Sequence, residues 1–336
     1  MRNAVGAYMA AAQRGAEWLI SQQAEDGSLW KHKGLDSCFK AAWALTATGH
    51  LTEASRLLSW AKAHAMPRPG DFYLPEETQD EKDWRFYRNC FFLIGAQKSG
   101  RFDVASAAAI GRMLEYQHPC GGFLGNRDES PSRFLDPLLT CLGGWTCLHT
   151  GQDAAAIRAA EFLLYVMEIQ PEIATRFYIL WDPEAGTLVT EFPADESISY
   201  TCELHRAQQH FFYVGAPMGY LSDVYKRTGE QRFLDGAWRY FDFESRTNPE
   251  GFSWPSKCKS GWGAALLYSV TGDTSARKMA EQVASQTLLA AQEADGGWST
   301  FHYPTRDDSG TSIEISRAEL TAEFVFELTE IARSLA

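Results

Sequence analysis

The chain has 336 residues, of which 45% are hydrophobic and 13% aromatic, and its formal net charge at pH 7 is −12. This acidic balance argues against a surface for nucleic acid or an anionic membrane, since both need clustered positive charge. No apolar run reaches the roughly 18–20 residues of a membrane span. The seven cysteines are scattered, so we expect no disulfide framework and a cytoplasmic location.

Glycine turns divide the chain into a regular series. One kind ends a helical pattern, in TGH, SGR, TGQ, TGE and TGD, at Gly49, Gly100, Gly151, Gly229 and Gly272. The other kind stands shortly before bulky residues, at Gly27, Gly70, Gly121, Gly186, Gly251 and Gly296. Glycine is the usual left-handed terminator of a helix, and a long repeat with two turns in each period predicts stacked helical hairpins.

The predicted helices form two alternating sets. Those over 4–24, 51–66, 102–117, 153–169, 230–244 and 275–292 are mostly amphipathic, which is typical of outer helices. Those over 36–48, 82–98, 133–149, 205–227, 257–270 and 313–334 are mostly apolar, which is typical of buried inner helices. The sequence therefore predicts an all-α (α/α)6 toroid formed by a single domain over 1–336. RFYILWD (176–182) and TLVTEF (187–192) predict a small β-hairpin insertion near 173–195.

Three of the glycine turns share a longer pattern. The stretches are Gln23–Trp30 (QAEDGSLW), preceded by Arg14, Gly15 and Trp18, then Gln117–Phe123 (QHPCGGF) and Gln292–Trp298 (QEADGGW). This pattern resembles the QW motif of squalene and oxidosqualene cyclases. The chain is similar to the terpenoid-cyclase and protein-prenyltransferase toroid superfamily over its whole length, through the rhythm of its hairpins. The architecture is also similar to small secondary-metabolism toroid enzymes, such as hetero-Diels–Alderases and the linalool dehydratase-isomerase type.

The metal and proton-donor motifs of that superfamily are missing from the sequence. Neither DxDD nor DDxxD occurs. Asp36-Ser37-Cys38 resembles the DxC segment of the prenyltransferase zinc site, and FYRNC (86–90) resembles FYHxC, but Arg88 stands where the zinc histidine would be. A cation cannot complete a zinc site. We therefore expect no metal and no cofactor.

We expect the site at the N-terminal ends of the inner helices, because the long loops that precede these helices collect polar residues there. The candidate catalytic residues are Asp36, Arg88, Asp136, His210 and Lys257. The candidate substrate-binding residues are Trp84, Arg85, Tyr87, Tyr213, Trp254, Lys259, Trp262, Trp298 and His302. Glu319 and Glu323 are further possible proton donors on the last inner helix.

Several candidates also have a structural interpretation. Arg85 and Arg88 share a helical face and could pair with nearby acids. Asp136 precedes a proline and could be a helix N-cap. His210 could be a structural histidine, and it lies five residues from His205, a spacing that does not suit a metal pair. The aromatic residue after each glycine turn, such as Trp298, could fill the gap between hairpins.

These features lead to three hypotheses for function. The first is a metal-independent cyclase or isomerase, with a pericyclase such as a hetero-Diels–Alderase as one form. Its substrate would be a small hydrophobic terpenoid or polyketide-like intermediate in an aromatic-lined central cavity, and the protein would be a monomer or homodimer that binds no nucleic acid and does not span a membrane. The second is a carbohydrate-active (α/α)6 enzyme: a glycosidase, epimerase or lyase. The third is a non-catalytic module that binds a small molecule or a partner.

Overall fold

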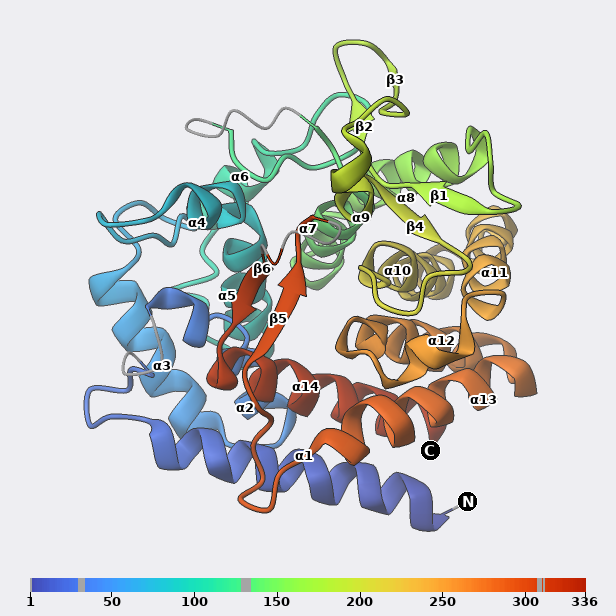
Figure 1. Cartoon of the computed structure of the whole chain (residues 1–336). Coiled ribbons are helices and arrows are strands. Elements are labelled where there is room, and N and C mark those ends of the chain that lie inside the picture. The colour runs from blue at the N-terminus through green and yellow to red at the C-terminus, as the bar shows by residue number, and fades with distance from the viewer. Residues whose placement is uncertain (1, 30–33, 128–133, 307–309, 311) are drawn as a thin grey trace.

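The computed structural model describes residues 2–29, 34–127, 134–306, 310 and 312–336. Six inner helices form a ring: α2 (Ala41–Ala47), α5 (Arg85–Lys98), α7 (Pro137–His149), α10 (Phe212–Thr228), α12 (Cys258–Thr271) and α14 (Arg317–Leu335). Each contacts the next, and α14 contacts α2, so the ring is closed (Figure 1). The expected all-α (α/α)6 toroid is confirmed.

Six outer helices surround this ring: α1 (Arg2–Gln22), α3 (Leu51–His64), α6 (Ala107–Leu114), α8 (Asp153–Glu168), α11 (Gln231–Ser245) and α13 (Thr274–Val283). A π-helical turn (Ala284–Leu288) and a 3₁₀ turn (Leu289–Ala291) extend α13. Short helices α4 (Gln79–Asp83) and α9 (Ser197–Tyr200) lie in the loops between the two layers. None of the described helices has the length and apolar character needed to cross a membrane.

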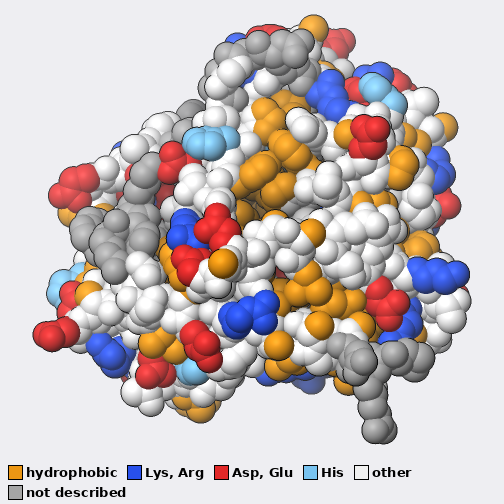
Figure 2. Space-filling view, turned by 60° about the horizontal axis from the view of Figure 1, so that its bottom comes forward, with side chains coloured by type: hydrophobic (Ala, Val, Ile, Leu, Met, Phe, Trp, Pro, Cys, Tyr) orange, Lys and Arg blue, Asp and Glu red, His pale blue; other side chains and the backbone are white. Residues whose placement is uncertain are grey.

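The connections differ at the two ends of the toroid. The first five inner helices each pass to the next outer helix through a shorter connection, as at 48–50, and we call this the short-loop end. The connections from outer to inner helices are long, as at 169–211, and lie at the long-loop end. On the face shown in Figure 2, acidic and basic side chains are interspersed.

The repeated glutamine-glycine turn joins neighbouring outer helices. The Gln117 amide donates to the carbonyl of Gly121 (3.0 Å) and to that of Ala155 in α8 (2.9 Å), while Arg158 donates to the Gln117 carbonyl. Gly121 has a φ of 104°, and a side chain there would overlap the Arg158 carbonyl. The turn therefore needs glycine both for its backbone and for close approach.

The same bonds recur in two other places. They are Gln23 to the carbonyls of Gly27 and Glu53, and Gln292 to those of Gly296 and Ala11. The hydrogen bond from Gln292 to Ala11 joins the turn after α13 to α1, so it closes the outer layer. Trp30 lies outside the described residues, whereas Trp298 is buried against Phe324 as a packing aromatic.

The predicted hairpin insertion is present in a shorter form. β2 (Trp181–Asp182) pairs with β3 (Thr187–Leu188) around the 183–186 turn, as expected. β1 (Arg176–Tyr178) pairs instead with β4 (Thr201–Glu203). The fourth inner helix was expected to begin at 205. The chain instead forms β4 and a loop there, and the helix begins at Phe212.

A second hairpin was not expected from the sequence. β5 (Phe301–Pro304) pairs with β6 (Ser312–Ile315), and Figure 1 shows it across the middle of the ring at the long-loop end. The helix expected from 313 consequently begins at Arg317, after the Ser316 N-cap. Alternate exposed and buried residues in β5 place Tyr303 inward and His302 outward.

Candidate functional site

All six inner helices place polar side chains at the long-loop end. The residues are Lys40 (N-cap of α2), Tyr87 (α5), Asp136 (N-cap of α7), Tyr213 (α10), Lys259 (α12), and Glu319 and Glu323 (α14). We call these seven residues the polar ring. Each is buried but keeps between 2% and 7% of its surface exposed. The helix starts therefore bring together groups that are far apart in the sequence.

Ion pairs hold one side of the polar ring together. Lys40 Nζ lies 2.8 Å from Glu319 Oε1 and 2.7 Å from Glu323 Oε2. Lys259 forms an ion pair with Glu323 Oε1 and lies 3.8 Å from Glu327 Oε1. Two ammonium groups thus face three carboxyl groups, so at least one carboxyl group gains by holding a proton.

The three carboxyl groups respond differently to this environment. Burial raises the pKa of Glu319 to about 7 and that of Glu327 to about 8. Burial acts in the same direction on Glu323, but Lys259 and Lys40 outweigh it and hold the pKa of Glu323 below its usual value. Glu323 is therefore the ionised member, while Glu319 can exchange a proton near neutral pH.

Asp136 is a second group that can exchange a proton near neutral pH. It is the predicted N-cap, and its Oδ1 accepts a hydrogen bond from the Leu139 N–H at 2.8 Å. Burial raises the pKa of Asp136 to about 7, and the backbone hydrogen bonds only partly oppose this shift. Its charge acts on the nearby Tyr213, whose pKa is raised chiefly by burial. Tyr213 therefore remains a hydrogen-bond donor.

His210 lies beside the polar ring in the loop before α10. Its ring packs on Phe212 (5.2 Å between centroids) and on Tyr303 of β5 (5.8 Å). The ring hydrogen-bonds the Pro304 carbonyl, and burial lowers the pKa of His210 to about 4. Nε2 is buried and has no hydrogen-bond partner among the described residues. A neutral imidazole with a free Nε2 is a possible base.

The two arginines expected at the site are held by ion pairs. Arg88 lies 2.9 Å from Asp36 Oδ1 and also forms an ion pair with Glu77, which pairs with Arg85 as well. Both arginines are almost fully buried, whereas the Asp36 side chain is 39% exposed. Pairing with nearby acids was the structural interpretation of these two arginines in the sequence analysis. The ion pairs lie at the start of α5.

Lys257 lies apart from the polar ring. Its Nζ contacts Glu244 Oε2 (2.5 Å) and Thr247 Oγ1 (2.7 Å), and Ser260 donates to the other Glu244 oxygen (2.9 Å). Lys257 and Glu244 are both 0% exposed. The pair joins α12 to α11 and has no opening to solvent.

The aromatic candidates are divided between several places. Trp84 packs edge-on against Tyr87, and Trp254 packs edge-on against Phe301 of β5, so both border the long-loop end. Trp262 stacks on Trp145 and lines a pocket at the short-loop end. His302 is exposed on β5, with Nδ1 3.4 Å from Ser312 Oγ.

Sequence reasoning did not single out Lys40, Glu327 or Tyr303. A signal existed for two of them. Glu327 continues the spacing of Glu319 and Glu323, four residues apart, between apolar residues of the last helix, and Lys40 stands just before an apolar helix that buries it. Such isolated charges in apolar helices predict paired, buried groups. Tyr303 belongs to the unexpected hairpin and had no comparable signal.

One group of described residues has the donor types of a metal site. Cys258, Glu323 and Glu327 are buried, and one ligand atom from each lies within 4.8 Å of the others. Both Glu323 oxygens already contact ammonium groups, one from Lys40 and one from Lys259. The two lysines thus balance the charge that would otherwise attract a cation.

No family model matches the chain, and neither does any curated protein. Solved structures do resemble it. A family 76 α-mannanase of Bacteroides thetaiotaomicron shares 12% identity over 98% of this chain and 97% of its own, with a TM-score of 0.62. D-mannose isomerase shares 10% over 93% and 90% (TM-score 0.64). An unsaturated glucuronyl hydrolase specific for heparin shares 9% over 99% and 98% (TM-score 0.64). At these identities the likeness establishes the fold.

The expected terpenoid cyclase or pericyclase, with a small hydrophobic substrate, is wrong. The similar structures are carbohydrate-active proteins by name, and the cyclase part of the resemblance finds no support among them. The physical reason lies in the polar ring. Lysine and carboxyl side chains line the long-loop end where an apolar aromatic wall was expected, because Lys40, Lys259 and Glu323 turn inward and pair there.

Proposed function

We propose that this chain is an enzyme that performs acid–base chemistry on a carbohydrate at the polar ring. The observation that carries the proposal is the convergence of all six inner helices on polar groups, two of which, Asp136 and Glu319, have pKa values raised to about 7. An acid or base works best when its pKa lies near the working pH. The mannanase, mannose isomerase and glucuronyl hydrolase of the same fold support a sugar substrate.

The polar ring offers the contacts that a polyhydroxylated substrate needs. Tyr87 and Tyr213 remain protonated, because burial raises both pKa values, that of Tyr87 to about 12. They can donate hydrogen bonds to sugar oxygens. Asp136 and Glu319 can each accept or donate a proton, and His210 Nε2 can accept one. Lys40 and Lys259 stabilise negative charge that develops on a substrate oxygen.

The reaction that fits best is proton transfer within a short saccharide, as in an isomerase or epimerase. The ring residues are at most 7% exposed, and such limited access favours a small sugar over a polymer. A neutral histidine and a carboxyl group of raised pKa are suited to moving a proton between carbon and oxygen.

Hydrolysis of a glycosidic bond is a second candidate. Glu319 and Glu323 share Lys40, yet the pKa of Glu319 is raised and that of Glu323 is lowered. Two carboxyl groups with opposite shifts are the arrangement in which one is a general acid and the other an ionised base or nucleophile.

One experiment tests the proposal and separates the two reactions. The protein is incubated in D₂O with D-mannose, D-glucose or α-1,6-mannotriose, and the products are followed by NMR. Proton transfer gives a new monosaccharide with deuterium on carbon, whereas hydrolysis gives new reducing ends without it. Turnover should fall in Asp136→Asn and Glu319→Gln. No turnover of any of the three sugars, or full activity in both variants, would refute the proposal.

A further inference from the structure

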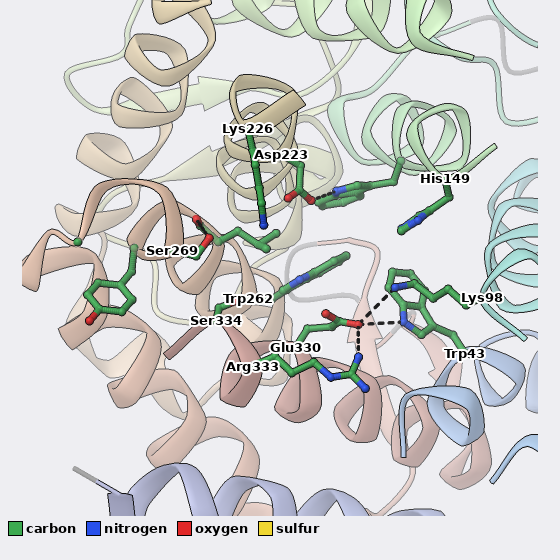
Figure 3. A pocket seen from close by; sticks show the side chains of 14 residues that line it. Trp43, Lys98, His149, Asp223, Lys226, Trp262, Ser269, Glu330, Arg333 and Ser334 are labelled. Atoms are coloured by element: carbon green, nitrogen blue, oxygen red, sulfur yellow. Dashed lines mark hydrogen bonds and ion pairs between the residues drawn. The ribbon is translucent and has the colours of Figure 1, made fainter. Parts of the chain in front are cut away.

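A second cavity lies at the opposite, short-loop end of the toroid. Its volume is about 570 Å³, and the C-terminal parts of the inner helices form its walls (Figure 3). Trp43, Trp145 and Trp262 form its floor and are only 1–3% exposed. A cavity of this volume is within the range of small-molecule sites. Trp43 packs against Phe91 (5.8 Å between centroids), which packs against Tyr87 of the polar ring (5.0 Å), so aromatic residues lie between the cavity and the polar ring.

Two carboxylates in this cavity each have one oxygen fixed by an indole. Trp145 Nε1 donates to Asp223 Oδ2 (2.9 Å), and Trp43 Nε1 donates to Glu330 Oε1 (3.4 Å). The second oxygen of each carboxylate has no hydrogen-bond partner among the described residues. Figure 3 draws Asp223 on one side of the Trp262 ring and Glu330 on the other. The cavity thus presents two oriented acceptors.

Cationic side chains surround these acceptors and nearly balance their charge. Lys98 lies 3.5 Å and Arg333 3.4 Å from Glu330 Oε1, and Lys226 acts electrostatically on Asp223. His149 is neutral, because burial lowers its pKa to about 3. A lining with donors, acceptors and little net charge gives no strong preference for an anion or a cation. It suits a neutral ligand with many hydroxyl groups, which both donate and accept.

Each indole ring of the floor has one face covered by another aromatic ring, and Lys98 Nζ lies over the Trp43 ring, 5.0 Å from its centroid. Trp262 stacks on Trp145 (4.3 Å between centroids), and Trp43 stacks on Phe326 (4.5 Å). Trp262 Nε1 is a buried donor without a partner among the described residues. Recognition here therefore depends on hydrogen bonds to fixed groups, which hydroxyl groups at several positions can satisfy together.

We propose that this short-loop cavity binds a neutral polyhydroxylated molecule the size of a monosaccharide or sugar alcohol. The binding does not depend on chemistry at the polar ring. Asp223 and Glu330 accept hydrogen bonds from the ligand hydroxyl groups, and Lys226 and Arg333 donate to them from the rim.

The test follows the indole N–H signals of the tryptophans in the floor of the cavity. Indole ¹⁵N–¹H signals of the whole chain are recorded during titration with D-mannitol, D-mannose and D-glucose. We expect the signals of Trp43 and Trp145 to shift with at least one of these, while that of Trp298, which donates to the Leu288 carbonyl elsewhere, stays constant. Assignment uses Trp→Phe variants. Absence of a shift in the floor signals with all three probes would overturn the proposal, as would a larger response to inorganic phosphate.

Two variants keep the outcome interpretable. Asp223→Asn replaces the free acceptor oxygen by a donor and should weaken binding about tenfold, or about 1.4 kcal/mol. Lys226→Met changes an exposed rim residue, so it should fold normally and weaken binding a few-fold. Asp136→Asn, at the other end, should leave this binding unchanged even where it abolishes turnover. Equal affinity in wild type, Asp223→Asn and Lys226→Met would refute the site without bearing on the polar ring.

Discussion

Lys257 and Lys259 stand two residues apart at the start of α12, yet they face different regions of the molecule. Lys257 turns outward to Glu244 of α11, and both partners are 0% exposed. Lys259 turns inward to Glu323 of α14, which also contacts Lys40. The first pair is closed and complete. The second belongs to the polar ring, whose side chains each keep 2–7% of their surface exposed.

The difference teaches how one helix start can serve two purposes. A closed pair with every polar atom satisfied can link layers, but it offers nothing to a ligand. A shared set with more carboxyl groups than cations retains a mobile proton, which chemistry can use. A buried lysine at a helix start is therefore not enough to identify a catalytic lysine. The other groups that contact the same carboxylate must be known as well.

The largest effect is expected from breaking the closed pair. Lys257→Met leaves the Glu244 carboxylate buried without its cation, and such a loss costs about 3–5 kcal/mol in free energy of unfolding. Chemical denaturation followed by circular dichroism measures it. Turnover per folded molecule should not change.

A double variant provides the control for this prediction. Replacing both partners, as in Lys257→Met with Glu244→Leu, removes the unpaired charge and should recover most of the lost stability, since apolar replacements of buried pairs are often neutral. If Lys257→Met were as stable as wild type but inactive, Lys257 would belong with the catalytic groups and the comparison would be wrong.

Lys259→Met should lower turnover more than it lowers stability, the opposite of Lys257→Met. Glu323 keeps Lys40 as a partner and Glu327 is already protonated at neutral pH, so the loss of stability should be smaller than for Lys257→Met. Turnover should fall roughly 10²–10³-fold, the usual effect of removing one preorganised donor. The NMR assay in D₂O measures this change. A variant that unfolds like Lys257→Met and retains turnover when folded would contradict it.

Much of the fold could be predicted from sequence, because glycine turns and apolar periodicity are local signals. The twelve helices of the two layers follow from them. The polar ring could be predicted from the sequence only in part. Asp136 and His210 were singled out because they stand near the start of an expected inner helix, whereas Lys40 and Lys257 look alike until their partners are known. Which lysine faces inward depends on long-range packing with α14 or α11, and that information is not local. The β5–β6 hairpin was missed because the residues of β6 were assigned to the helix expected from 313, and those of β5 to the loop before it.

Asp136→Asn isolates the titrating group in the polar ring. Asparagine is also a good N-cap, so the helix start is preserved. Because the folded-state pKa of Asp136 is raised to about 7, its contribution to stability is present below the unfolded value near 4 and lost as pH rises through 7. The free energy of unfolding of wild type, relative to the variant, should therefore fall between pH 5 and pH 8. Denaturation at both values measures the difference.

Asp273→Asn is the matched control, since Asp273 is the N-cap of α13 at the surface. Hydrogen bonds from Ser275 lower the pKa of Asp273, so this carboxyl group is ionised in both states above pH 5. Its substitution should give no pH-dependent difference between pH 5 and pH 8. The same slope in both variants would show that the Asp136 signal does not come from burial at the polar ring.

The smallest effect is expected at the turn that closes the outer layer. Gln292→Ala removes the hydrogen bonds to Gly296 and to Ala11 of α1 and should cost about 1–2 kcal/mol. Gln117→Ala removes the matching bonds between consecutive helices, with a similar global cost. The two should differ locally, because Gln292 holds the N-terminal helix against the last hairpin. Hydrogen exchange should therefore rise in α1 for Gln292→Ala alone. Equal exchange in α1 for both variants would mean that its packing on α14 suffices to close the toroid.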